Sequence, residues 1–157
     1  MIYVGIDPGK KGGIVGLKSN GDILFKHIMP MQDKIVYTPE LVTYFMYPAQ
    51  IKIMIEEPIA MPKQNVKATF TVALNYGAIL GALECECYEY ETVHPRTWQA
   101  EMFQGVEGDN SKEKALTVAK RLWADVDFRA SSRCKKAHDG VVDAALIAEY
   151  YRRQNDN

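Results

Sequence analysis

The sequence lacks the features that mark several special classes of protein. Its three cysteines are an odd number, and the Cys-Glu-Cys spacing of Cys85 and Cys87 matches no usual zinc or redox motif. No apolar run approaches about 20 residues, the length of a membrane span. The N-terminus has no basic segment followed by an apolar one, so no signal peptide is visible. We therefore expect a cytoplasmic protein with free thiols, including Cys134, and no membrane association.

Charge of one sign, internal repeats and low-complexity tracts are also missing. The net charge is −1, from 19 Lys and Arg against 20 Asp and Glu, so the sum alone indicates no partner. Hydrophobic residues make up 47% and charged residues 25%, which is ordinary for a globular protein. A chain of 157 residues can bury a sizeable core. We expect a single domain over residues 1–157.

The first strand, residues 2–6, organises the chain. It is apolar, rich in β-forming residues and without charge, as expected of a buried central strand. Asp7 follows it, where a carboxylate is costly unless a cation meets it. Proline and glycine pairs over residues 8–13 turn the chain back, and residues 14–17 and 23–25 read as two further strands. The chain thus begins as a three-stranded meander with Asp7 at the tip of its first strand.

A second apolar strand, residues 51–55, also ends on acidic residues, Glu56 and Glu57. If it lies parallel to the first strand, one of these glutamates joins Asp7 at the sheet edge where open α/β sheets place their sites. Alternation sends the two glutamates to opposite faces. Glu56 is favoured because it directly follows the apolar run, whereas Glu57 precedes a proline.

The rest of the chain shows alternating helical and strand patterns. A helix with a small-residue face that includes Ala73, Gly77 and Gly81 is a candidate dimer interface, although that face could also pack on its own sheet. The remaining expected elements are a helix from residue 40 to about 47, capped by Thr38 and stopped by Pro48, a helix over 68–83, an edge strand over 87–93, a short helix after 94, a basic amphipathic helix over 112–123, and a last helix over 139–151.

Two aspartates of the last helix complete an acidic set. Asp139 and Asp143 are four residues apart and so project from nearly the same face, which requires a compensating cation. With Asp7 and Glu56 they make four carboxylates, ligands that suit Mg²⁺ or Mn²⁺. Two such ions about 3.5–4 Å apart can clamp an in-line phosphoryl displacement. Taken singly, Asp7 could be a turn residue and Asp139 a helix cap.

Four short motifs in order resemble the RuvC family of Holliday junction resolvases, most closely its short, phage-encoded members. They are Ile-Asp-Pro-Gly at 6–9, Ile-Glu at 55–56, His-Pro-Arg-Thr-Trp at 94–98 and His-Asp-Gly-Val-Val-Asp-Ala at 138–144. The likeness covers Met1 to Tyr151. It implies an α/β, ribonuclease H-like fold with a five-strand mixed sheet flanked by helices. It also implies a homodimer on a four-way DNA junction, acting in recombination and repair in a bacterial or phage-infected cell.

The resemblance assigns roles residue by residue. Asp7 matches the first metal aspartate, Glu56 the glutamate, and Asp143 the aspartate before Ala144. The cellular enzymes space their last two ligands three apart, but residue 140 here is glycine, so either Asp139 or His138 completes the site. Asp139 is favoured because it shares a helix face with Asp143.

The family activity implied is a Mg²⁺-dependent endodeoxyribonuclease with two ions per active site, for which Mn²⁺ can substitute. A deprotonated water attacks the scissile phosphate, and nicking leaves 5′-phosphate and 3′-hydroxyl ends. Basic residues flank each acid, as binding of DNA phosphates requires. The apolar Ile59 and Met61 of loop 58–65 are predicted to unstack bases at the branch point. The predicted DNA contacts are Lys10, Lys11, Ile59, Met61, Lys63, Lys67, Arg96, Arg129, Arg133, Lys135 and Lys136.

Two other classes of function remain open at this stage. An Asp-x-Gly loop after a strand also opens the phosphate loop of actin-like ATPases and sugar kinases, although those chains need two such domains. The protein could also be a junction-binding module without turnover. Mg²⁺-dependent nicking of a labelled junction separates these alternatives from a nuclease.

Overall fold

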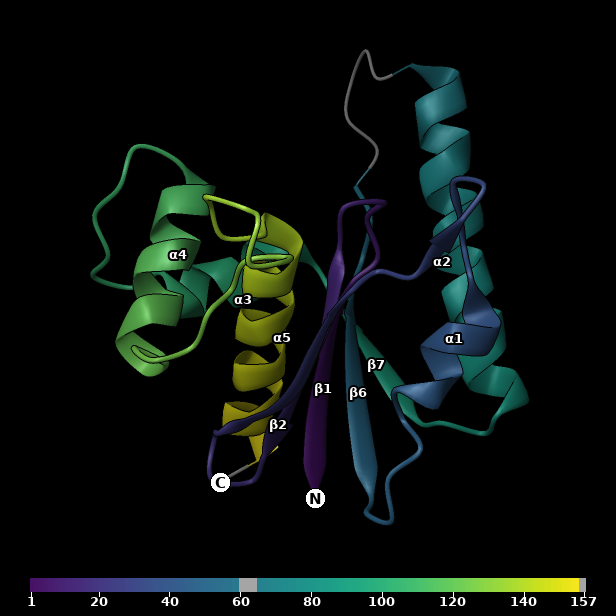
Figure 1. The fold of residues 1–157 in the computed structure, drawn as a ribbon, viewed down its shortest axis with the longest axis horizontal. Coiled ribbons are helices and arrows are strands. Elements are labelled where there is room, and N and C mark those ends of the chain that lie inside the picture. Colours follow the sequence, from purple (N-terminus) through teal and green to yellow (C-terminus); the bar gives the residue numbers. More distant parts are fainter. Residues whose placement is uncertain (60–64, 156–157) are drawn as a thin grey trace.

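A five-stranded mixed sheet forms the centre of the molecule in the computed structural model, which describes residues 1–59 and 65–155 (Figure 1). The strand order is β3-β2-β1-β6-β7. The pairs β1–β2 and β2–β3 are antiparallel, whereas β1–β6 and β6–β7 are parallel. The expected meander is therefore confirmed, and the two acid-tipped strands lie parallel, which is the condition for their acids to share one sheet edge. The strands are β1 (Ile2–Asp7), β2 (Gly13–Lys18), β3 (Ile23–Ile28), β6 (Ile51–Glu56) and β7 (Tyr90–Val93).

Helices cover both faces of this sheet (Figure 1). On one face lie α1 (Thr38–Thr43) and α2 (Val66–Cys85). On the other face lie α3 (Pro95–Met102), α4 (Ser111–Leu122) and α5 (Asp139–Asn155). The architecture is the expected mixed sheet flanked by helices.

The alternation of side chains along each strand divides the core into two clusters, one on each face of the sheet. Tyr3 of β1 packs with α5 and the adjoining helices. Val4 and Ile6 of the same strand pack in the other cluster, with Ile79 of α2 and Leu41 of α1. Because both faces are covered, β1 is buried along its whole apolar run, as its composition predicts.

Strand β1 and helix α5 approach each other closely, and glycines permit this contact. A Cβ added at Gly5 would lie 2.1 Å from the Ala144 carbonyl oxygen of α5. A Cβ at Gly140, in the first turn of α5, would lie 2.2 Å from the Lys11 carbonyl oxygen. Gly140 also forms a parallel bridge with Gly12, so the start of α5 lies against the β1–β2 loop.

Local structure departs from the sequence expectations in four places. A small hairpin, β4 (Met31–Gln32) with β5 (Ile35–Val36), was not predicted; Asp33 and Lys34 at its turn have φ values of 48° and 71°. The first helix ends at Thr43 rather than 47, and its N-cap is Tyr37 rather than Thr38. The helix predicted over 68–83 runs from Val66 to Cys85. Strand β7 begins only at Tyr90, because Cys87, with φ 58°, interrupts an extended backbone.

Helix α2 leaves most of its surface exposed. Asn75, Ile79 and Leu83 are its buried residues, whereas Val66 and Phe70 are 84% and 66% exposed. A Cβ at Gly77 or Gly81 would meet nothing within 4 Å, so these glycines do not pack on the sheet. This 20-residue helix is long and apolar enough to cross a membrane by length and composition alone. The expectation that no apolar stretch approaches this length is therefore wrong.

Candidate acidic site at the carboxyl edge of the sheet

Two carboxylates meet where the parallel strands β1 and β6 end. Ile6 pairs with Ile55, and Asp7 and Glu56 directly follow these partners. The carboxylate of Asp7 accepts a hydrogen bond of 2.9 Å from the Gly9 N–H. This bond holds Asp7 at the β1–β2 turn. The charge of Asp7 lies near Glu56 and raises the pKa of that carboxyl group.

Glu56 and Glu57 have different partners, as alternation predicts. The Trp98 indole N–H of α3 donates a hydrogen bond of 3.0 Å to Glu56, and Trp98 itself is buried. Glu57 instead accepts a 2.7 Å hydrogen bond from the Thr92 hydroxyl of β7. The structure therefore brings Glu56, and not Glu57, together with Asp7. It also gives Trp98, the last residue of the motif at 94–98, a role in holding Glu56.

Helix α5 adds Asp143 to the pair. Asp143 is partly buried and lies close enough to Asp7 and Glu56 for their charges to act on it. Burial raises the pKa of Asp143 to about 8, and the charges of Asp7, Glu56 and Asp139 act in the same direction. Lys112 of α4 acts against them.

Burial also raises the pKa values of the other two acids. The pKa of Asp7 is raised by burial, although the Gly9 N–H and the charge of His138 oppose the change. Burial raises the pKa of Glu56 to about 7; the Trp98 hydrogen bond opposes this, and the charge of Asp7 adds to it. Three mutually repelling carboxyl groups thus lie together in a poorly solvated place, and added positive charge would stabilise their ionised forms.

The donor set fits a hard divalent cation. Carboxylate oxygens are the ligands that Mg²⁺ and Mn²⁺ prefer. The electrostatic coupling of Asp7, Glu56, Asp143 and Asp139 shows that these oxygens share one region. Within residues 1–59 and 65–155, no group of three or more Asp, Glu, His or Cys side chains has the geometry of a formed metal site. The fit therefore rests on the chemistry and the shared location of the donors.

Both alternatives for the last ligand adjoin the site. Asp139 forms an ion pair with Lys112 Nζ at 2.5 Å. His138 precedes α5, where its Nδ1 accepts a 3.4 Å hydrogen bond from the Val141 N–H, and its charge lowers the pKa of Asp7. A side chain at Gly140, the position where the family places a ligand, would collide with the β1–β2 loop. The choice between Asp139 and His138 stays a prediction, with both within reach of the acidic cluster.

Sequence reasoning missed Lys112, which it included only as the first residue of a basic amphipathic helix. Its pKa is raised by the hydrogen bond to Asp139 and by the charges of Asp139 and Asp143. The only local signal is its place in the first turn of α4, after the Asn110 cap. Its approach to Asp139 depends on how α4 packs against α5, which periodicity does not reveal.

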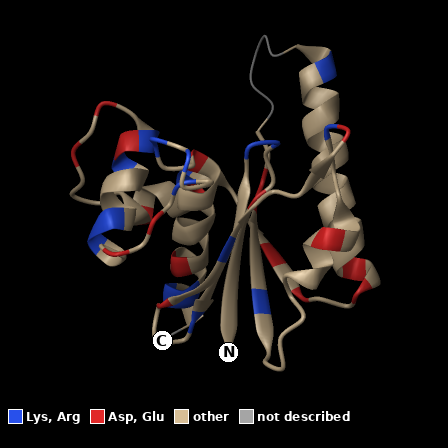
Figure 2. Ribbon diagram, viewed as in Figure 1, with Lys and Arg blue, Asp and Glu red and all other residues tan. Residues whose placement is uncertain are grey.

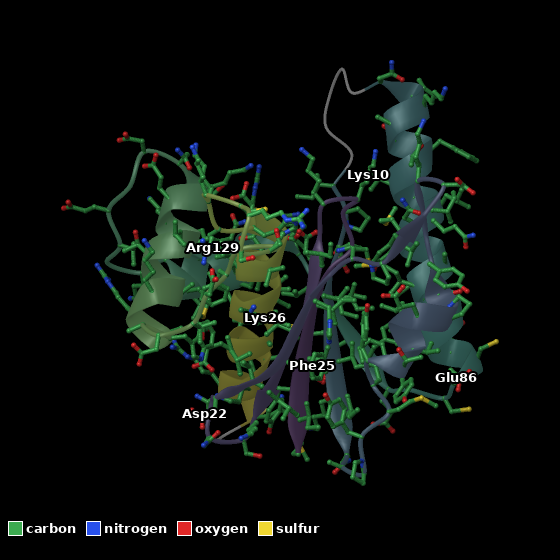
Figure 3. All side chains as sticks on the ribbon, in the orientation of Figure 1. Lys10, Asp22, Phe25, Lys26, Glu86 and Arg129 are labelled. Carbon is green, nitrogen blue, oxygen red and sulfur yellow. The ribbon has the colours of Figure 1, made fainter. Side chains whose placement is uncertain are left out.

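The predicted DNA contacts that the structure describes are all exposed. In the ribbon of Figure 2, blue Lys and Arg positions occur at the upper end of the molecule, in the β1–β2 turn and near α4, as well as in its lower half. Lys10 and Lys11 line a cleft of about 420 Å³ together with His138. Arg129, which is labelled with Lys10 in Figure 3, forms an ion pair with Asp127 at 2.8 Å. Met61 and Lys63 lie outside the described residues. The other predicted contacts are Ile59, Lys67, Arg96, Arg133, Lys135 and Lys136, all on the surface.

Comparison with known proteins points to one fold. No family model matches the sequence, and no curated protein matches it. Among solved structures, Thermus thermophilus RuvC matches with a TM-score of 0.63 at 17% identity, covering 99% of this chain and 97% of that one. The T. thermophilus RuvC complex with Holliday junction substrate matches with a TM-score of 0.64 at 16% identity, covering 98% and 96%. The chain therefore shares, over nearly its whole length, the ribonuclease H-like fold of RuvC.

Proposed function

We propose that this protein is a metal-dependent, structure-selective DNA endonuclease that resolves Holliday junctions and other branched DNA by symmetric nicking. The observation that carries the proposal is the convergence of Asp7, Glu56 and Asp143 at the carboxyl edge of the sheet. The shared fold supports it, since one RuvC structure with that fold contains a Holliday junction substrate. Nicking would leave 5′-phosphate and 3′-hydroxyl ends.

The acidic cluster would hold the metal ions. Asp7, Glu56 and Asp143, with Asp139 or His138, are the proposed ligands of two Mg²⁺ ions, for which Mn²⁺ can substitute. When bound, the ions supply positive charge to the scissile phosphate and promote deprotonation of the attacking water. Glu56 is kept in place by the hydrogen bond from the Trp98 indole.

Lys112 has a distinct part in this proposal. Its ammonium offsets the charge of Asp139 and acts on Asp143. It therefore limits repulsion at the exposed end of the cluster before the substrate arrives. Because it lies on α4, which also borders the basic segment 129–136, it links the acids to the surface proposed to bind phosphates.

Substrate binding would rest on the exposed cations around the acids. Lys10, Lys11, Lys135 and Lys136 flank the cluster on two sides, so binding should weaken steeply with salt. Ile59 is 42% exposed just after the strand that carries Glu56, as a wedge at a branch point requires.

A second copy of the chain would cover the exposed face of α2. Val66, Phe70 and Leu74 lie at helical spacing and are 84%, 66% and 44% exposed. Open space at Gly77 and Gly81 lets another helix approach closely. A homodimer places two copies of the site symmetrically, as two matched nicks require. We place its activity in the cytoplasm of a bacterial or phage-infected cell.

The test is cleavage of an end-labelled four-way junction by the purified protein with Mg²⁺, Mn²⁺ or EDTA. We expect symmetric nicks with either metal, none with EDTA, and much slower cutting of linear duplex of the same sequence. Asp125→Asn, which changes an exposed aspartate away from the cluster, serves as the matched control for Asp7→Asn. Tight junction binding without nicking under any metal would overturn the nuclease and leave a binding module.

A further inference from the structure

A cleft of about 800 Å³ opens directly beside the acidic cluster, and most of its lining residues are not proposed ligands. Its walls are α4, the segment 124–137 that follows it, and the first turn of α5. Leu116, Val126 and Ala137 give it an apolar floor, and all three are only partly buried against the core. An apolar floor left open to solvent in this way is typical of a ligand site.

The cleft is continuous with the site. Asp139 and Asp143 line it together with Val142, so its inner end is the outer side of the acidic cluster. A DNA strand whose phosphate lies at the acids therefore has a neighbouring nucleotide at the mouth of this cleft.

Unpaired cations stand on the rim. Lys120, Lys135 and Lys136 line the cleft, and within the described part of the chain none of them forms an ion pair. Lys112 and Arg129 also line it but are paired with Asp139 and Asp127. A purely apolar ligand would not interact favourably with the three unpaired cations, and a lone phosphate would not contact the apolar floor. The lining therefore fits a ligand that has both an apolar part and negative charge.

The far wall of the cleft is held in place by hydrogen bonds within the segment. Arg129 binds both carboxylate oxygens of Asp127 and donates a 3.3 Å hydrogen bond to the Cys134 carbonyl. The His138 N–H donates to the Phe128 carbonyl at 2.8 Å, and Phe128 is 4% exposed. Arg129 thus serves to shape the wall (Figure 3). A preformed wall lowers the entropic cost of binding.

From this arrangement we infer that the cleft accepts one unstacked nucleobase of the scissile strand, next to the cleaved phosphate. The floor of Leu116, Val126 and Ala137 contacts the face of the base, and the rim lysines contact the phosphates on either side of it. The inference rests on the proposed nuclease function. It gives the enzyme a means to prefer certain bases at the nick, because cleft size and floor contacts differ between purines and pyrimidines.

The test places 2-aminopurine, whose emission rises when it leaves the base stack, at successive positions flanking the nick in a four-way junction. The Asp7→Asn protein is used so that the junction stays intact. Two variants fill the cleft in that background: Ala137→Phe from the floor, and Ala124→Phe from its exposed outer end. Ala130→Phe adds the same ring to the same segment outside the cleft lining and is the matched control.

We expect an emission rise at one position with the Asp7→Asn protein and with the Ala130→Phe control. Both filling variants should lose that rise while junction affinity stays within about threefold, because no charge changes. Each variant's melting temperature is measured, so a misfolded Ala137→Phe protein leaves the decision to Ala124→Phe. A rise that survives in the folded filling variants, or no rise at any flanking position, overturns the inference. Loss of junction binding by the wild-type protein overturns the proposed function instead.

Discussion

Removing the charge of Asp143 should stabilise the metal-free protein, and by more at higher pH. Burial and the neighbouring acids raise the pKa of Asp143 from 3.8 to about 8. Between these two values the folded protein keeps a proton that the unfolded chain has already released. The stability that comes from this proton is complete below pH 3.8 and is lost as the pH rises towards 8. Asp143→Asn, which is neutral at every pH, avoids that loss.

The size of this change in unfolding free energy follows from the difference between the pH and the ordinary pKa of Asp143, 3.8. Each unit is about 1.4 kcal/mol, so ionisable Asp143 costs roughly 4 kcal/mol of unfolding free energy at pH 7 and about 1–2 kcal/mol at pH 5. At about 2–4 °C per kcal/mol for a chain of this length, the full effect is roughly 10 °C at pH 7. Asp7 and Glu56 repel each other as well as Asp143, so part of the repulsion remains when Asp143 is neutral. We therefore expect Asp143→Asn to raise the melting temperature by at least half of this amount.

Thermal unfolding with EDTA, from pH 5 to pH 8, measures the effect. The melting temperature of Asp143→Asn should exceed that of wild type by an amount that grows with pH. Asp125→Asn, an exposed aspartate, should change little at either pH. A gain for Asp143→Asn that is equal at pH 5 and pH 8, or a loss at both, would refute the reasoning that repulsion in a buried cluster raises this pKa.

Four further predictions test other parts of the site and fold. Asp7→Asn should abolish nicking while junction binding, measured by gel shift, persists; retention of more than a few per cent of wild-type cutting speaks against Asp7 as a ligand. Glu56→Gln should be inactive and Glu57→Gln near wild type in the same cleavage assay, and the reverse result would move the site to the other face of the strand. Phe70→Glu should give a monomer by light scattering where wild type gives a dimer, and a wild-type monomer with or without junction DNA would refute the interface. Gly140→Ala should lower the melting temperature by several degrees, because its Cβ would lie 2.2 Å from a backbone oxygen, and an unchanged value would show that α5 can shift.

Sequence reasoning succeeded where one local pattern decides the structure. The largely apolar runs before Asp7 and Glu56 predicted two strands, and the structure meets the condition that they lie parallel. Alternation sent Glu56 and Glu57 to opposite faces, and the place of Glu56 directly after the apolar run favoured it as the partner of Asp7. The acidic set is thus assembled from elements that were each visible in the sequence, although its identity as a metal site stays a prediction.

The remaining features depend on contacts between distant parts of the chain. The hairpin β4–β5 is held by Asn75 of α2, which accepts from the Val36 N–H at 3.0 Å and donates to the Lys34 carbonyl at 3.3 Å. The local sequence of residues 31–36 does not indicate that Asn75 will be its hydrogen-bonding partner. Lys112 likewise reaches Asp139 only through the packing of α4 on α5. Periodicity assigned the helices but could not place their faces against each other.

The closeness of β1 to α5 has a consequence for the timing of activity during synthesis. Asp7 is synthesised before Asp143, which belongs to α5, and a Cβ added at Gly5 would lie 2.1 Å from the Ala144 carbonyl oxygen of that helix. Until α5 docks, one face of the central strand lacks its cover and the acidic cluster lacks a member. An incomplete nascent chain therefore carries Asp7 and Glu56 without Asp143, so the acidic cluster is complete only once α5 has docked and the fold is complete.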